Sequence, residues 1–184
     1  MSLLKTPICE FGKESINFSL FSTDNIKTDL KSVKGPSGTL IMFICNHCPY
    51  VKTVIHELVK TTEKAKLMGF NSVAIMPNDY VKYPEDNLEN MTLFSKKNKF
   101  NFPYLLDKNQ KVAKLYGAVC TPDFFCYNAK DELQYRGRIR GLKDLLPEEN
   151  SENELLKAIT LISKTGTGPE KQFPSMGCSI KWKD

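Results

Sequence analysis

The sequence predicts an α/β fold in which a central mixed β-sheet is flanked by helices. Three observations support this prediction. The run GTLIMFIC, residues 38–45, is continuously apolar, as in a strand that is buried on both faces. From Pro49 the apolar residues follow helical spacing, and this switch between strand and helix periods recurs along the chain. Later, two strand-like runs are joined by a short polar turn, which predicts an antiparallel hairpin after parallel crossovers.

The first half of the chain alternates between strands and helices. The buried strand at 38–45 follows a Pro-Ser-Gly turn, and the helix that begins at Pro49 is predicted to end at Gly69. A second buried strand is predicted at 71–77. The segment 84–100 begins with acidic residues and ends with lysines, the charge order that a helix dipole favours, so we predict one helix there.

The second half continues with shorter elements. We predict a short strand at 103–107 and a brief helix at 110–117, which a glycine closes. The runs 124–127 and 133–139 form the predicted hairpin. A last helix is predicted at 151–163, because its leucines and isoleucines recur on one face.

Size and composition predict one soluble globular domain spanning 1–184. Its core is placed at about 35–163, with an N-terminal extension at 1–34 and a C-terminal tail at 164–184. Apolar residues make up 41% of the chain and charged residues 26%, which is typical of globular proteins. No segment has the pattern of a signal peptide or a membrane span, so we expect a cytoplasmic protein with no membrane partner.

The net charge of +5 comes mainly from scattered lysines. Scattered lysines usually coat a surface, and no aromatic platform accompanies the arginines, so we expect no nucleic-acid partner. The three arginines, Arg136, Arg138 and Arg140, are expected to lie in solvent.

Two of the six cysteines, Cys45 and Cys48, lie in CNHCP, between the first buried strand and the first helix. Unpaired N–H groups and the helix dipole stabilise a thiolate at such a position, where the pKa of a cysteine can fall from about 8.5 to roughly 3.5–7.5. Two cysteines at this spacing can cycle between dithiol and disulfide. His47, between them, would favour the thiolate form.

Two other interpretations of this cluster remain open. Cys45, His47 and Cys48 could be soft ligands of a copper- or zinc-binding protein, although a tetrahedral site needs further donors that the sequence does not offer. The cluster could also be a structural turn. Since a strand-to-helix junction of an α/β fold is where redox dithiols occur, we favour redox chemistry, with no resident metal and no cofactor.

A second feature supports the redox interpretation. Thr121-Pro122 immediately precedes the hairpin, where a cis proline in a tight turn is expected. A dithiol at the start of the first core helix, together with this Thr-Pro pair, resembles the thioredoxin fold. The resemblance implies that Thr121 and Pro122 face the dithiol and bind extended substrate segments.

Further stretches narrow the resemblance. The chain is similar to the peroxiredoxin-like branch of the alkyl hydroperoxide reductase/thiol-specific antioxidant superfamily over about residues 43–183. The stretches that carry this similarity are NHCPYVK, YPEDNLENM, FPYLLD, YGAVCTPDFF, YRGR and PSMGCSIKWK. The resemblance implies an antioxidant enzyme of redox homeostasis.

The resemblance implies two competing mechanisms. In a thiol peroxidase, Cys48 would attack a hydroperoxide, and Pro49 after it fits that family's motif. However, Cys45 stands where the motif has threonine and Ile41 where it has proline, and the arginine's place falls near Thr121-Pro122. Little is then left to polarise the peroxide bond. We therefore favour a thiol–disulfide oxidoreductase in which Cys45, expected to be the more exposed sulfur, attacks a substrate disulfide and Cys48 resolves the mixed disulfide.

The expected partners follow from this chemistry. They are a protein or small-molecule disulfide or a hydroperoxide as substrate, and a thiol reductant such as a thioredoxin-type protein or glutathione. The protein itself is expected to be a monomer or a homodimer.

Three other residues are candidates for the site. Asn78 and Asp79 follow the second buried strand and could bind substrate, although a simple Asn-Asp turn before a helix is favoured slightly. Cys178 lies in a run whose apolar residues alternate as in a strand. It could pair at a sheet edge or act as a third thiol over the dithiol, but a packing role is favoured. For Cys9 and Cys126 we expect packing or surface positions, and Cys120 could point either way.

Overall fold

The computed structural model describes residues 3–183. Its central seven-stranded sheet has the order β3-β2-β6-β5-β4-β8-β9. The strands of this sheet are β2 (Ser19–Ser22), β3 (Lys27–Asp29), β4 (Gly38–Phe43), β5 (Phe70–Met76), β6 (Tyr104–Leu106), β8 (Asp123–Asn128) and β9 (Leu133–Gly137). The pairs β4–β5 and β5–β6 are parallel, whereas β8 pairs antiparallel with both β4 and β9. The predicted mixed sheet is therefore confirmed.

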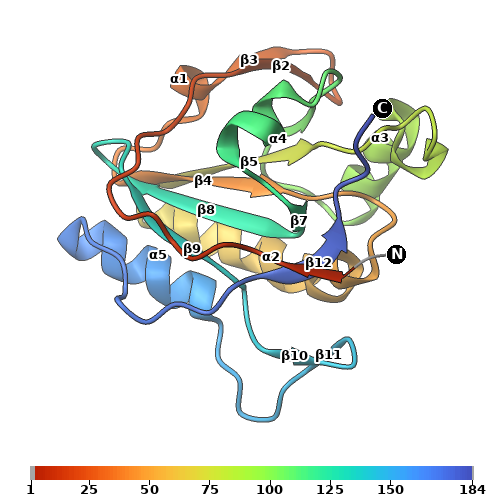
Figure 1. Ribbon diagram of the computed structural model, residues 1–184. Coiled ribbons are helices and arrows are strands. Elements are labelled where there is room, and N and C mark those ends of the chain that lie inside the picture. Colours follow the sequence, from red (N-terminus) through yellow and green to blue (C-terminus); the bar gives the residue numbers. More distant parts are fainter. Residues whose placement is uncertain (1–2, 184) are drawn as a thin grey trace.

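Helices cover both faces of the sheet (Figure 1). They are α1 (Leu30–Val33), α2 (Pro49–Leu67), α3 (Leu88–Lys97), α4 (Lys111–Tyr116) and α5 (Glu154–Thr165), with a 3-10 turn η1 (Pro84–Asp86). Helices α2 and α5 pack on one face, where Leu40 and Met42 of β4 point. Helices α1 and α4 pack on the other face against Ile41 and Phe43. Strand β4 is thus buried on both faces, as its apolar run predicts. No helix within residues 3–183 is long and apolar enough to cross a membrane.

A second, smaller sheet lies beside the start of α2. It has the order β1-β12-β7, with β1 (Leu3–Lys5), β12 (Met176–Ser179) and β7 (Cys120–Thr121). A hairpin of β10 (Leu142–Lys143) and β11 (Leu146–Pro147) projects from the body (Figure 1). Both segments predicted to be additions to the core therefore contribute strands. Strands β2 and β3 extend the main sheet, and the tail supplies the middle strand of the small one.

The predicted helices differ from the structure at their starts. The segment 84–100 is not one helix, because the backbone of Asn87 is extended. The side chain of Asn87 accepts a hydrogen bond from the N–H of Asn90 and so caps the N-terminus of α3. Helix α5 begins later than predicted, since Asn153 caps it in the same way. The end of α2 is as predicted, with Gly69 at a φ of 78° just beyond its last turn.

The expectation that the three arginines lie in solvent is wrong, because all three have acidic partners in the fold. Arg136 is 6% exposed, and its guanidinium donates to both carboxylate oxygens of Asp123, at 2.9 and 3.4 Å. Arg138 pairs with Glu154 at 2.8 Å, and the Nε of Arg140 lies 2.9 Å from Glu57. These arginines hold the fold together rather than forming a basic surface.

Candidate active site

The loop between β4 and α2 places Cys45 and Cys48 in the interior. Cys48 is the N-cap residue of α2, and Pro49 occupies the first helical position, where a missing N–H costs nothing. Both cysteines are completely buried. The expectation that Cys45 is the more exposed sulfur is therefore wrong, and exposure does not decide which sulfur attacks.

Three cysteine side chains and one backbone carbonyl meet at the start of α2. The Sγ of Cys48 lies 3.0 Å from the Sγ of Cys178 and 3.1 Å from the carbonyl oxygen of Thr121. The Sγ of Cys45 lies 3.2 Å from the hydroxyl of Thr121. All three cysteines are unbonded thiols in the structure. We call Cys45, Cys48 and Cys178 the sulfur cluster.

Within this cluster Cys48 is the sulfur that ionises. The pKa of Cys48 falls to about 5, mainly because the Cys45 thiol donates a hydrogen bond to its sulfur. Burial raises this pKa, but further hydrogen bonds from the Cys178 thiol and the N–H of Val51 lower it. For Cys45, burial, the hydrogen bond to Cys48 and the negative charge of Asp86 raise the pKa well above its ordinary value. These opposite pKa directions favour Cys48 over Cys45 as the thiolate, the reverse of the predicted order.

His47 belongs to a network that sequence analysis missed. Its Nδ1 lies 2.7 Å from Asp86 Oδ2, which also accepts from the side-chain amide of Asn78 at 2.8 Å. The N–H of Asn46 donates to the other oxygen of Asp86, which is completely buried. The hydrogen bond to Asp86 raises the pKa of His47, so that the imidazolium persists near the thiolate. The acidic PED segment was predicted only as a helix start, and nothing local indicates that Asp86 turns inward.

Replacement of His47 by Asn should lower the free energy of unfolding by about 1–2 kcal/mol at about pH 5.5, and by less at about pH 8.5. Asp86 raises the pKa of His47 above its ordinary 6.5. The stability that this pair contributes is therefore fully present below the ordinary pKa and is lost as pH rises through the raised value. Urea unfolding across this range measures it, with His56→Asn, at an exposed histidine, as the control. A difference that does not change with pH would contradict the prediction.

Asn78 and Asp79 are buried with partners inside the protein. Asn78 accepts from the N–H of Lys181 at 2.9 Å in addition to holding Asp86. Asp79 accepts from the N–H of Val81 at 3.1 Å, as in an Asx turn. These contacts favour the turn interpretation over direct substrate contact. Asn78 supports the site by positioning Asp86.

The peptide bond between Thr121 and Pro122 is cis, as predicted, and both residues lie against the sulfur cluster. However, their backbone edge is already occupied. Strand β12 pairs antiparallel with β7, with Cys178 opposite Thr121 and Ser179 opposite Cys120. Gly177 permits this approach, because a Cβ there would lie 2.0 Å from the carbonyl oxygen of Thr121. The prediction that this edge receives an extended substrate is therefore wrong for the structure as it stands, since the chain's own C-terminal strand fills it.

Cys178 is buried in the core, as the favoured packing role predicts, and it also belongs to the sulfur cluster. It pairs at a sheet edge and also places its sulfur on Cys48, so both alternatives to packing hold together. The other cysteines lie outside the cluster. Cys126 is buried in the core, Cys9 is half-buried, and Cys120 is buried with its sulfur 3.7 Å from the carbonyl of Pro122.

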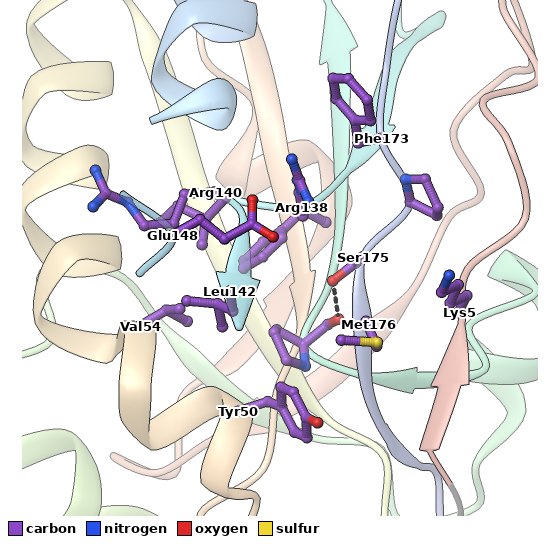
Figure 2. A pocket seen from close by; sticks show the side chains of 14 residues that line it. Lys5, Tyr50, Val54, Arg138, Arg140, Leu142, Glu148, Phe173, Ser175 and Met176 are labelled. Carbon is purple, nitrogen blue, oxygen red and sulfur yellow. Dashed lines mark hydrogen bonds between the residues drawn. The ribbon is translucent and has the colours of Figure 1, made fainter. Parts of the chain in front are cut away.

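A cavity of about 290 Å³ has Tyr50 of α2 and Met176 of β12 in its lining (Figure 2). Tyr50, Pro122 and Met176 line it, and each is a near neighbour in sequence of a cluster cysteine or of Thr121. Basic side chains, among them Lys5 and Arg138, line the rest together with Phe173 and Glu148. The cavity therefore combines an apolar wall with basic and acidic side chains, and no cluster cysteine is part of its lining.

The predicted metal-ligand set is only partly assembled. Among residues 3–183, the group that could hold an ion is Cys45, His47 and Asp86, whose ligand atoms lie within 4.8 Å of one another. Cys48 is not in this group, and both oxygens of Asp86 already accept hydrogen bonds from the protein. These donors fit a histidine–carboxylate pair better than a metal site.

Comparison with solved structures identifies proteins of similar fold. An uncharacterised conserved protein of Geobacillus kaustophilus is 40% identical, with a TM-score of 0.91 over 100% of this chain and 97% of that one. The thioredoxin domain of a thiol-disulfide oxidoreductase of Bacteroides vulgatus is 16% identical, with a TM-score of 0.58 over 68% and 86% of the two chains. The peroxidoxin BcpB of Mycobacterium tuberculosis is 13% identical, with a TM-score of 0.59 over 84% and 94%. The last two likenesses show that the fold is thioredoxin-like.

No curated protein matches the sequence. The model of the AhpC/TSA family, in contrast, matches residues 11–140, which include β2 through β9 and two of the three cluster cysteines. The sequence resemblance is thereby confirmed: this chain belongs to the AhpC/TSA family.

Proposed function

We propose that the protein is a thiol–disulfide oxidoreductase with a role in redox homeostasis, and that Cys48 is its nucleophile. One observation carries the proposal: Cys48 is the N-cap residue of α2, and its sulfur has two further thiols beside it. The thiolate attacks one sulfur of a substrate disulfide and releases the other as a thiolate. A second cluster thiol then attacks Cys48, which frees the rest of the substrate and leaves an intramolecular disulfide.

The enclosure of the cluster favours small substrates. All three sulfurs are buried, and β12 covers the Thr121 edge where an extended protein segment would pair. The cavity beside Pro122 has room for the non-reacting part of a small disulfide, and Lys5 in its lining suits a carboxylate group. A cytoplasmic thiol, such as glutathione or a thioredoxin-type protein, would return the enzyme to its reduced state.

A second candidate function is reduction of small hydroperoxides through Cys48. The same enclosure favours it, because a hydroperoxide is smaller than a disulfide. The groups that would polarise the peroxide bond are engaged elsewhere, however. The hydroxyl of Thr121 contacts Cys45, and Arg136 and Arg138 are held by Asp123 and Glu154. We therefore expect the peroxidase reaction to be the slower one.

A direct test compares three oxidants with the fully reduced protein. We expect oxidised glutathione to consume two protein thiols reversibly, with a second-order rate constant at least about tenfold above those for insulin and for hydrogen peroxide. Thiol titration and stopped-flow quenching measure this, with metal analysis of protein purified without chelator in parallel. No thiol loss with either disulfide, or a bound stoichiometric metal, would contradict the proposal. Fastest oxidation by the peroxide would favour the second candidate.

A further inference from the structure

We propose that Cys178 is the thiol that resolves mixed disulfides on Cys48, so that the enzyme passes through a Cys48–Cys178 disulfide joining β12 to the start of α2. The inference rests on the proposed function and deepens it. It gives the resolving step to a sulfur 130 positions away in the sequence rather than to Cys45 within the CNHC motif.

The contact between these two sulfurs is close and well fixed. Their Sγ atoms lie 3.0 Å apart, so a disulfide of about 2.05 Å requires them to approach by only about 1 Å. On one side of Cys178, the hydroxyl of Ser175 donates to the carbonyl of Pro122 at 2.7 Å. On the other, the N–H of Lys181 donates to the side chain of Asn78 at 2.9 Å. Anchored at both ends, β12 holds the Cys178 sulfur on Cys48.

The approach of β12 depends on a glycine next to Cys178. Any larger residue at Gly177 would meet the Thr121 carbonyl, and the register places Cys178 itself opposite Thr121. The strand therefore lies where the resemblance to the thioredoxin fold places an extended substrate, and its cysteine meets the nucleophile as a substrate sulfur would. The C-terminal strand is a built-in partner for Cys48.

Charge favours Cys178 over Cys45 as the second nucleophile. Cys45 has the buried carboxylate of Asp86 nearby, which opposes its ionisation throughout the cycle. Burial and the neighbouring Cys48 raise the pKa of Cys178 to about 12, whereas the ammonium of Lys181 lowers it. Once Cys48 is bonded to substrate it carries no negative charge, so its opposition to ionisation of Cys178 ends. The same loss of charge also eases ionisation of Cys45, but the Asp86 carboxylate still opposes it there, whereas Lys181 still favours it at Cys178.

The two steps balance as an oxidation of two thiols by one disulfide. Cys48 thiolate attacks RS–SR′, the S–S bond breaks, and R′S⁻ leaves with the electron pair. Cys178 loses its proton to the departing R′S⁻, its thiolate attacks the Cys48 sulfur, the bond to RS breaks, and RS⁻ leaves with the electron pair. The substrate is reduced to two thiols, and an external thiol reductant later reverses the oxidation of the protein. Cys45 stays reduced and serves as the hydrogen-bond donor that keeps Cys48 ionised.

The first experiment needs no substitution. Reduced wild-type protein is mixed with one equivalent of oxidised glutathione, quenched with acid at successive times, alkylated and digested, and its disulfides are mapped by mass spectrometry. We expect the first intramolecular disulfide to join Cys48 and Cys178. A Cys45–Cys48 disulfide appearing first would overturn the inference while leaving the proposed function intact. Absence of any glutathione adduct or disulfide on Cys48 would overturn both.

The second experiment follows decay of the Cys48–glutathione adduct in variants. We expect the adduct to persist at least about tenfold longer in Cys178→Ser and Cys178→Ala than in wild type. Cys45→Ser, whose hydroxyl still donates to Cys48, should still form the Cys48–Cys178 disulfide, and Cys120→Ser should behave as wild type. Adduct decay at the wild-type rate in both Cys178 variants would sink the inference. Thermal unfolding of each variant verifies that it folds.

Discussion

Cys48→Ser should lower the rate constant for reduction of a small disulfide by at least about a hundredfold, because a hydroxyl at this position does not ionise and cannot form the mixed disulfide. The pKa of the Cys48 thiol, about 5, means that this sulfur is a thiolate at neutral pH. The pH dependence of wild-type alkylation by iodoacetamide should therefore show an inflection near that value, and the variant should lose it. Stopped-flow kinetics and alkylation mapped by mass spectrometry measure the two effects.

Two controls make this expectation specific. Cys126→Ser changes a cysteine that lies in the core outside the cluster, and it should retain the rate. Cys45→Ala should raise the pKa of Cys48 without removing the nucleophile, since it removes the hydrogen bond that the Cys45 thiol donates to Cys48. Retention of wild-type turnover by Cys48→Ser would show that another cysteine starts the reaction.

Asp123→Ala should lower the free energy of unfolding by about 3–5 kcal/mol, because it leaves a buried guanidinium without its carboxylate. Asp123 is completely buried, and Arg136 is 6% exposed. The guanidinium also donates to the carbonyl of Gly117 at 2.7 Å and lies 4.5 Å over the ring of Phe125. Neither contact replaces the lost negative charge. Urea unfolding followed by circular dichroism measures the change.

A double variant distinguishes loss of the pair from loss of packing. Asp123→Ala combined with Arg136→Met should cost less than the sum of the two single changes, since no unpaired charge is left in the core. Glu10→Ala, which breaks an exposed ion pair with Lys13, should change stability by less than about 1 kcal/mol. A cost below about 1 kcal/mol for Asp123→Ala alone would mean that water reaches Arg136.

The elements that the sequence predicts well are those with a strong apolar period. Strand β4 is apolar at every inner position, and α2 shows its buried stripe in the spacing of Val51, Val54 and Leu58. Strands β2 and β3 lack such a signal, because they are short and partly exposed, and β2 joins the sheet through pairing with β6 some 80 residues on. The break at Asn87 was also missed, since an asparagine side chain that caps a helix resembles one within it.

The candidate site also has one part that local sequence pattern predicts and another that it does not. The position of Cys48 at a helix start follows from local pattern, so this part of the candidate site was predictable. The proposed roles of Cys45 and Cys48 could not be predicted in this way. They depend on which sulfur lies near the Asp86 carboxylate and which sulfur accepts hydrogen bonds from thiol and N–H groups. Asp86 and Cys178 reach the cluster only through tertiary structure, and no local pattern reports such contacts.

The C-terminal position of β12 has a consequence for synthesis on the ribosome. Cys48 and Cys178 are 130 residues apart, and at about 5–20 residues per second roughly 7–26 s pass between their translation. During that interval the nascent chain has Cys45 and Cys48 but neither the closing strand nor the last thiol, and the free edge of β7 has no neighbour to pair with. Within the sulfur cluster, a disulfide formed this early can link only Cys45 and Cys48. The cluster is thus complete only after β12 has been translated.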